Sequence, residues 1–217
     1  MRRWNGWGEA TTVVELPAQG AGFLAERLGV GRVLPDATLE EALARVPASR
    51  LAAHGLYSIE PHDRLLHARG QSLPDWLALR EGAPGLYPDA VAFPDSTGQV
   101  RQLLALAQAQ DLCLIPYGGG TSVAGHINPP DSVRPVVTVS LARMNRLLDL
   151  DEQSLLATFG PGASGPQVES QLRARGYTLG HFPQSWELST LGGWVASRSS
   201  GQQSLRYGRI EQLFAGG

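Results

Sequence analysis

Three consecutive glycines follow closely on an apolar run, and this junction constrains the fold more than any other feature of the chain. Residues 112–115 (Leu-Cys-Leu-Ile) have the composition of a buried strand. Gly118, Gly119 and Gly120 then remove every Cβ that would keep a ligand away from the peptide N–H groups. Successive uncovered N–H groups form a concave anion site. The junction therefore predicts a phosphate-bearing cofactor, with a plain glycine-rich turn as the alternative.

The residues before this junction predict a parallel sheet. Residues 90–93 read as a strand, residues 96–110 as a helix and residues 112–115 as a second strand. Ser96 and Gln99 form a capping-box pattern at the start of that helix. A crossover of this length favours a parallel strand pair, which places the glycine loop at the carboxyl end of the second strand. Ligands bind at such ends in open α/β sheets.

The flanking segments predict a helical region and further strands. Residues 1–85 read as helical and irregular. Residues 135–139 predict another strand, and residues 146–150 and 155–159 predict an antiparallel hairpin. A helix is expected over residues 166–175, because a proline begins it and a glycine follows it.

Composition excludes several classes of protein. The net charge of −2 over 217 residues offers no basic field for nucleic acid, and no apolar window approaches a transmembrane segment. All 18 basic residues are arginine, so a P-loop and Schiff-base chemistry are excluded within these residues. Cys113 is the only cysteine, which excludes an intramolecular disulfide. The N-terminus lacks the apolar core of a secretory signal, so a cytoplasmic location is expected.

Two other glycine sets match a dinucleotide fingerprint. Residues 160–165 fit G-x-G-x-x-G between a predicted strand and a predicted helix, which makes a nicotinamide site the rival interpretation. Against it, the preceding strand reads as half of a hairpin, and Glu187 lies at no clear strand end. Residues 20–25 follow Pro17 rather than a strand, which makes them the weaker set.

A further loop resembles the first in its chemistry. Ser189 and Thr190 can cap a following helix, while Gly192 and Gly193 clear the backbone for a flat or phosphorylated ligand. The alternative is an ordinary capped helix with a close packing contact.

Several spaced segments occur in the order found in flavoproteins of the vanillyl-alcohol-oxidase class. They are residues 116–122 (PYGGGTS), 144–147 (MNRL), 180–181 (GH), 189–195 (STLGGWV) and 207–211 (YGRIE). Within that class the chain resembles the alkyldihydroxyacetonephosphate synthase (alkylglycerone-phosphate synthase) family and the bacterial FAD-linked oxidases. The resemblance implies an α+β fold: a PCMH-type FAD-binding domain of two α+β subdomains with FAD between them, preceded by a mainly helical N-terminal region.

The resemblance also implies a division of the chain and a set of site residues. The N-terminal helical region covers residues 1–85 and the FAD-binding domain residues 86–217, with a first subdomain to about residue 140 and a second from about residue 141, incomplete at the C-terminus. The implied FAD contacts are Pro116, Tyr117, Gly118, Gly119, Gly120, Thr121, Ser122, Gln184, Ser185, Ser189, Thr190, Gly192, Gly193, Ser197, Arg198, Ser199 and Ser200. FAD is expected to bind non-covalently, because His126 lies in a segment that the synthases use without attachment.

The implied function is that of an FAD-linked oxidase acting on a small-molecule substrate, with no metal. Phe182 and Gln184 stand where the synthases tend to carry acidic residues, which weakens the synthase alternative. The third alternative is an inert truncated nucleotide-binding module. In the family a substrate-covering domain follows, so we expect the catalytic residues to lie beyond Gly217 and this chain alone to be inactive. A homodimer is a candidate assembly.

Overall fold

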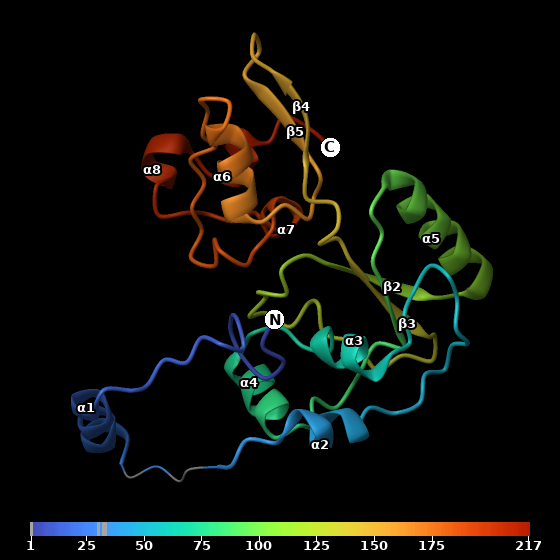
Figure 1. Ribbon diagram of the computed structural model, residues 1–217, viewed down its shortest axis with the longest axis vertical. Helices are drawn as coiled ribbons and strands as arrows, with labels where there is room; N and C mark the ends of the chain where they lie inside the picture. The colour runs from blue at the N-terminus through green and yellow to red at the C-terminus, as the bar shows by residue number, and fades with distance from the viewer. Residues whose placement is uncertain (1, 30, 32–33) are drawn as a thin grey trace.

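The computed structural model describes residues 2–29, 31 and 34–217. Two small α/β units face each other, one built on a three-stranded sheet and the other on a β-hairpin (Figure 1). The N-terminus lies between them. The helices at Leu39–Ala44, Pro61–Leu66 and Leu73–Arg80 lie on the side of the first unit that faces away from the second, whereas the helix at Ala18–Leu28 stands apart (Figure 1). No helix of the described residues is long and apolar enough to cross a bilayer.

The first unit is a parallel sheet. Its elements are β1 (Ala90–Ala92), α5 (Thr97–Gln110), β2 (Cys113–Tyr117) and β3 (Val136–Ser140). The strand order is β1-β3-β2, and both outer strands run parallel to β3. The prediction that β1 and β2 form an adjacent pair is therefore wrong, although both are parallel members of one sheet. The later strand β3 inserts between them because its five residues are all buried and need a neighbour on each side.

Helix α5 packs its apolar side on this sheet. Leu103 and Ala107 join the core formed by β1 and β3, whereas Leu104 is 57% exposed. The Ser96 side chain accepts from the Gln99 backbone N–H at 3.4 Å, but the Gln99 side chain accepts from Asp95 instead of completing a capping box. One half of the predicted capping box is thus formed.

The second unit begins with the predicted antiparallel hairpin, β4 (Leu147–Asp151) and β5 (Leu156–Phe159). Helix α6 (Gly165–Arg173) follows, close to its expected position, and buries Val168 and Leu172. The remaining helices of this unit are α7 (Leu191–Ser197), α8 (Ser204–Tyr207) and α9 (Ile210–Leu213).

The described residues of the N-terminal region form four helices: α1 (Ala18–Leu28), α2 (Leu39–Ala44), α3 (Pro61–Leu66) and α4 (Leu73–Arg80). Helices α2 and α4 begin at full capping boxes, whereas α1 buries none of its residues. A buried carboxylate, Asp89, ties this region to the sheet: it pairs with Arg50 at 2.7 Å and accepts from the Val136 N–H.

Candidate functional site

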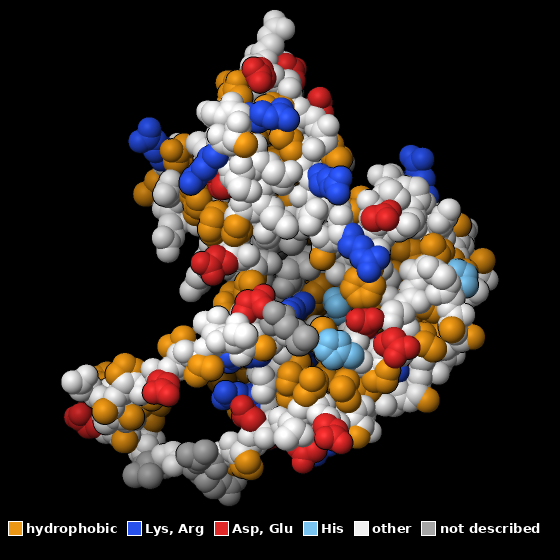
Figure 2. Space-filling view, in the orientation of Figure 1, with side chains coloured by type: hydrophobic (Ala, Val, Ile, Leu, Met, Phe, Trp, Pro, Cys, Tyr) orange, Lys and Arg blue, Asp and Glu red, His pale blue; other side chains and the backbone are white. Residues whose placement is uncertain are grey.

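A cleft of about 400 Å³ lies at the carboxyl ends of β2 and β3, where the two units meet. Figure 2 shows charged side chains of both signs around the hollow between the units. The lining comes from the N-terminal residues, the end of α3 with the segment after it, Phe93 after β1, the glycine loop, the connection from β3 to α6, and the loop before α7. Their lining residues include Arg2, Trp7, Gly118, Gly119, Thr121, Ser140, Ala142, Gly162, Ser164, Gln167, Glu187, Leu188 and Thr190.

The glycine loop presents uncovered backbone donors to this cleft. Within the described part of the chain, the N–H groups of Gly118, Gly119, Gly120 and Thr121 donate to no protein acceptor. Gly120 has a φ of 71°, a left-handed conformation that turns the chain sharply after β2. Consecutive amides in such a turn form a concavity that suits an anion. This is the arrangement that the sequence predicts.

The glycines themselves are needed for a different reason from the one expected. A Cβ on Gly118 would overlap Thr190 Oγ1, and a Cβ on Gly119 would overlap the Leu188 carbonyl oxygen. The absent side chains therefore let the loop of the first unit pack directly on the loop of the second. The direction of the missing Cβ is occupied by protein at both glycines.

Thr190 lies opposite the glycine loop and has an unpartnered hydroxyl. Its side-chain oxygen is buried and has no hydrogen-bond partner among the described residues. Thr190 is the N-cap residue of α7, but its side chain forms no capping bond, so the expected cap is absent. A buried hydroxyl without a partner is costly unless a ligand satisfies it. The Thr190 hydroxyl therefore marks the second wall of the site.

The glycine pair of α7 behaves differently from the first glycine loop. The Gly192 N–H donates to the Pro161 carbonyl at 2.8 Å, and a Cβ on Gly192 would lie 2.7 Å from Pro161 Cβ. The Leu191 N–H donates to Ala163. For Gly192 the close-packing alternative describes what the structure shows. Ser189 also has a local role, because its hydroxyl accepts from the Trp194 indole N–H at 2.7 Å.

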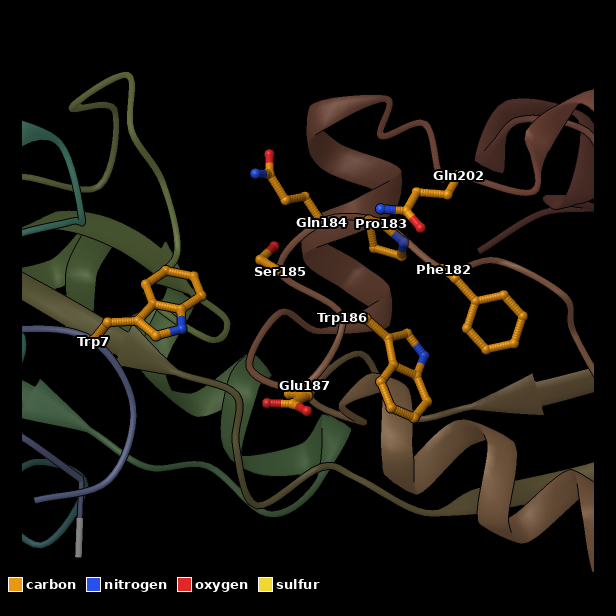
Figure 3. Close-up of a pocket in the computed structure, with 8 residues that line it drawn as sticks. All are labelled: Trp7, Phe182, Pro183, Gln184, Ser185, Trp186, Glu187 and Gln202. Carbon is orange, nitrogen blue, oxygen red and sulfur yellow. The ribbon is translucent and has the colours of Figure 1, made fainter. Parts of the chain in front are cut away.

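Gln184 and Ser185 line a second cavity, of about 280 Å³, beside the cleft. Figure 3 shows Trp7 on one side of this cavity and Phe182 and Trp186 on the other, with Gln184 and Ser185 between them. Trp7 and Glu187 line both cavities, so the two form neighbouring parts of one depression.

The last predicted segment, residues 197–200, lies at the C-terminal end of α7. Ser199 Oγ is 2.7 Å from His181 Nε2, and the Ser197 hydroxyl donates to the Gly193 carbonyl. Arg198 is the left-handed C-cap of the helix. Neither cavity includes these residues or Ser200, and their role in binding stays a prediction.

The rival fingerprint of residues 160–165 contributes to the same cleft. Gly162 and Ser164 line it, although β5 pairs antiparallel with β4, so the fingerprint lacks the parallel context of a nicotinamide site. A Cβ on Gly162 would overlap the Leu141 carbonyl, so close packing also accounts for this glycine. The sequence did not place residues 160–165 at this cleft, because sequence spacing does not show that the connection from β3 passes beside α6.

Two groups of the N-terminal region, Arg2 and His67, contribute to the electrostatics of the cleft. Arg2 carries a positive charge into it, while His67 is buried and contacts the Tyr117 ring at 4.7 Å. Burial lowers the pKa of His67 to about 4, so this ring is neutral at pH 7. Glu9 and Glu187 add carboxylates to the lining. Among the described residues no group of three metal-ligating side chains occurs.

Comparison with known proteins identifies the family. The profile of the FAD binding domain family matches residues 88–216. Alkyldihydroxyacetonephosphate synthase of Trypanosoma brucei brucei is 31% identical over 97% of this chain and 40% of its own length. An uncharacterized FAD-linked oxidoreductase of Escherichia coli is 36% identical over 59% of this chain and 26% of its own length. A solved structure of an alkyldihydroxyacetonephosphate synthase superimposes with a TM-score of 0.86 at 30% identity, covering 97% of this chain and 44% of the other.

The geometry of the cleft agrees with this match. Uncovered amides, a guanidinium and an unpartnered hydroxyl converge at one place, and these are the donors that a diphosphate accepts from. The chain spans less than half the length of these relatives. It belongs to the FAD binding domain family, with the PCMH-type FAD-binding fold and FAD as its cofactor.

Proposed function

We propose that this chain forms the cofactor-binding part of an FAD-dependent oxidoreductase and holds FAD non-covalently in the cleft between its two units. The observation that carries the proposal is the pairing of the uncovered amides of residues 118–121 with the buried, unpartnered hydroxyl of Thr190. Both walls of the cleft thus offer donors that the protein leaves unused.

The roles of the lining residues follow from their positions. Gly118, Gly119, Gly120 and Thr121 bind the diphosphate through their N–H groups. Thr190 donates its hydroxyl from the opposite wall, and Gln184 and Ser185 extend the site into the second cavity. The tight contact of Gly119 with Leu188 fixes the distance between the walls. Tyr117 acts from behind the loop, because its side chain is only 1% exposed.

Bound flavin supplies electron-accepting chemistry, while the protein positions it and sets the electrostatics around it. We assign the described lining to binding and orientation of FAD. Its histidine, His67, is buried and neutral, and its other ionisable groups are Arg2, Glu9 and Glu187. A small-molecule substrate acted on by the whole protein, the cytoplasmic location and the homodimer stay predictions.

A second candidate is alkylglycerone-phosphate synthesis, which the name of the Trypanosoma relative supports. Its match over 97% of this chain favours this function. The neutral Phe182 and Gln184, both lining the second cavity, weigh against it. An anaerobic assay of the complete enzyme separates the two functions: a 2-hydroxy acid bleaches the flavin of an oxidase, whereas acyl-dihydroxyacetone phosphate and a fatty alcohol give an ether product without net oxidation.

Cofactor titration of the purified chain tests the binding proposal. FAD is expected to raise the melting temperature in a concentration-dependent way while NAD does not, since only a ligand of the folded state stabilises it. Acid denaturation should then release the yellow flavin into the supernatant. A shift with NAD alone would overturn the cofactor site, and flavin that stays with the precipitate would overturn non-covalent binding.

A further inference from the structure

The N-terminal residues form a small hairpin that delivers a side chain into the cleft. The backbones of Arg2 and Glu9 form an antiparallel bridge, and the Arg3 N–H donates to the Gly8 carbonyl at 2.9 Å. Gly8 has a φ of 79°, which closes this turn. The hairpin places the start of the chain between the two units (Figure 1). Its residues Arg2, Gly6, Trp7, Gly8 and Glu9 all line the cleft.

The guanidinium of Arg2 is fixed beside the glycine loop. Its Nη2 donates to the Tyr117 hydroxyl at 2.6 Å, and its Cζ lies 5.5 Å from the centre of the Tyr117 ring. A Cβ on Gly120 would lie 2.5 Å from the same Nη2, so the charge stands directly against the loop. The Tyr117 side chain is buried, which gives Arg2 a rigid anchor.

Most of the hydrogen-bonding capacity of Arg2 is unused. A guanidinium carries five N–H donors, and the Tyr117 hydroxyl accepts from one nitrogen. Among the described residues, Arg2 forms no ion pair with a carboxylate, whereas Arg50, Arg69, Arg80, Arg134 and Arg173 each do. A positive charge held in a cleft without a protein counter-ion is suited to an anionic ligand.

We propose that Arg2 binds the FAD diphosphate, with Tyr117 as the residue that positions it. This inference rests on the proposed cofactor site. It adds a positive charge that compensates the negative charge of the diphosphate, because the glycine-loop amides donate hydrogen bonds but carry no net charge. Among the described residues, Arg2 is the only arginine in the lining, and the other basic side chain there, His67, is neutral.

Substitution of Arg2 tests the inference against a matched control in the same hairpin. Arg2→Gln is expected to raise the Kd for FAD about 10- to 100-fold, the cost of a charged hydrogen bond. Arg2→Lys keeps the charge without the planar fork and should fall between this variant and the wild type. Arg3→Gln should change the Kd less than about twofold, because Arg3 donates to the Thr12 carbonyl rather than to the cleft lining.

Ligands with and without phosphate sharpen the test. Flavin fluorescence titration measures FAD and riboflavin, and competition against FAD measures ADP and adenosine. The Arg2→Gln variant should lose affinity for FAD and ADP while riboflavin and adenosine bind as they do to the wild type. Melting temperatures confirm that each variant is folded, and the Arg2→Lys variant keeps the test valid if Arg2→Gln does not fold.

The outcomes separate this inference from the proposed function. Equal FAD and ADP affinities in the wild type and the Arg2→Gln variant would overturn the role of Arg2 and leave the cofactor site standing. An equal loss for all four ligands would also overturn it, since the effect would then be structural. A wild-type chain that binds none of them would overturn both.

Discussion

The two walls of the cleft use similar glycine-rich loops for different purposes. In the first unit, the amides of residues 118–121 donate to no described acceptor, and Gly118, Gly119 and Thr121 line the cleft. In the second unit, the first amides of α7 donate hydrogen bonds to the carbonyls of Pro161 and Ala163. Both loops contain consecutive glycines, yet only the first leaves its backbone N–H groups without an acceptor among the described residues. The second wall contributes a side chain instead, the hydroxyl of Thr190.

This difference shows that a glycine pair near a ligand does not by itself identify a phosphate contact. A glycine amide can contact a ligand only if no protein carbonyl accepts its N–H. Whether one does depends on the carbonyls that neighbouring segments place near it. Gly119 and Gly192 both exclude a Cβ through contact with protein. Their amides differ because β2 ends at the cleft, while α7 begins against the strand-like segment before α6.

The largest effect is expected for Gly119→Val, which should abolish FAD retention. The added branched side chain would overlap the Leu188 carbonyl and push the two walls apart, so the amides and the Thr190 hydroxyl could no longer reach one ligand. Flavin absorbance per chain after gel filtration measures this. Gly98→Ala is the control, since its Cβ meets only Ser96 Oγ at 3.9 Å. Full flavin content in the valine variant would show that the contact between the walls does not position the site.

The next effect concerns acid stability, because two histidines, His67 and His181, are buried. Burial lowers the pKa of His67 to about 4 and also lowers that of His181. Below the unfolded value of about 6.5 the unfolded chain binds more protons than the folded one, so stability is complete above that pH and falls as the pH approaches 4. The His67 contribution to this loss is roughly 3 kcal/mol.

Denaturant unfolding of a His67→Gln variant at pH 7 and pH 4.5 measures this contribution. The variant should lose less of its free energy of unfolding between the two pH values than the wild type does. His126→Gln, at an exposed position, should keep the wild-type dependence. If the His67 variant keeps it as well, the acid sensitivity comes from other groups.

Gly192→Ala tests the second wall as a packing element. Its Cβ would lie 2.7 Å from Pro161 Cβ and 2.9 Å from the Pro161 oxygen, so we expect a destabilisation of about 2 kcal/mol. FAD affinity at temperatures where the variant is folded should change little, because the Gly192 amide already has its acceptor. Thermal melting and FAD titration measure the two quantities separately. A large affinity loss with unchanged stability would assign Gly192 to the ligand.

The smallest effect is expected for Thr190→Val. This change should stabilise the cofactor-free chain and weaken its binding of FAD. Removing a buried hydroxyl without a partner should stabilise the cofactor-free chain by about 1 kcal/mol. The same change should weaken FAD binding about tenfold, since the hydroxyl is then lost as a donor. Melting curves with and without FAD show both signs in one experiment. A destabilised free chain with normal FAD affinity would remove Thr190 from the site.

The sequence by itself determined the local elements around the site. The apolar run before Gly118 predicts β2, and the two strand-like runs at 146–150 and 155–159 predict the hairpin β4–β5. Both elements are present. These features depend on periodicity and on turn residues, which act over a few positions. The motifs also indicated FAD through the resemblance to a known class, and the family match confirms that cofactor.

Only the tertiary structure decided which predicted residues meet. The insertion of β3 between β1 and β2, the contact of Gly119 with Leu188 and the approach of Arg2 to Tyr117 join residues far apart in the chain. No local pattern encodes such contacts, because they depend on how whole elements pack. Packing also determined that the amide of Gly192 bonds to Pro161 while that of Gly119 stays free, since a hydrogen bond requires an acceptor within about 3 Å.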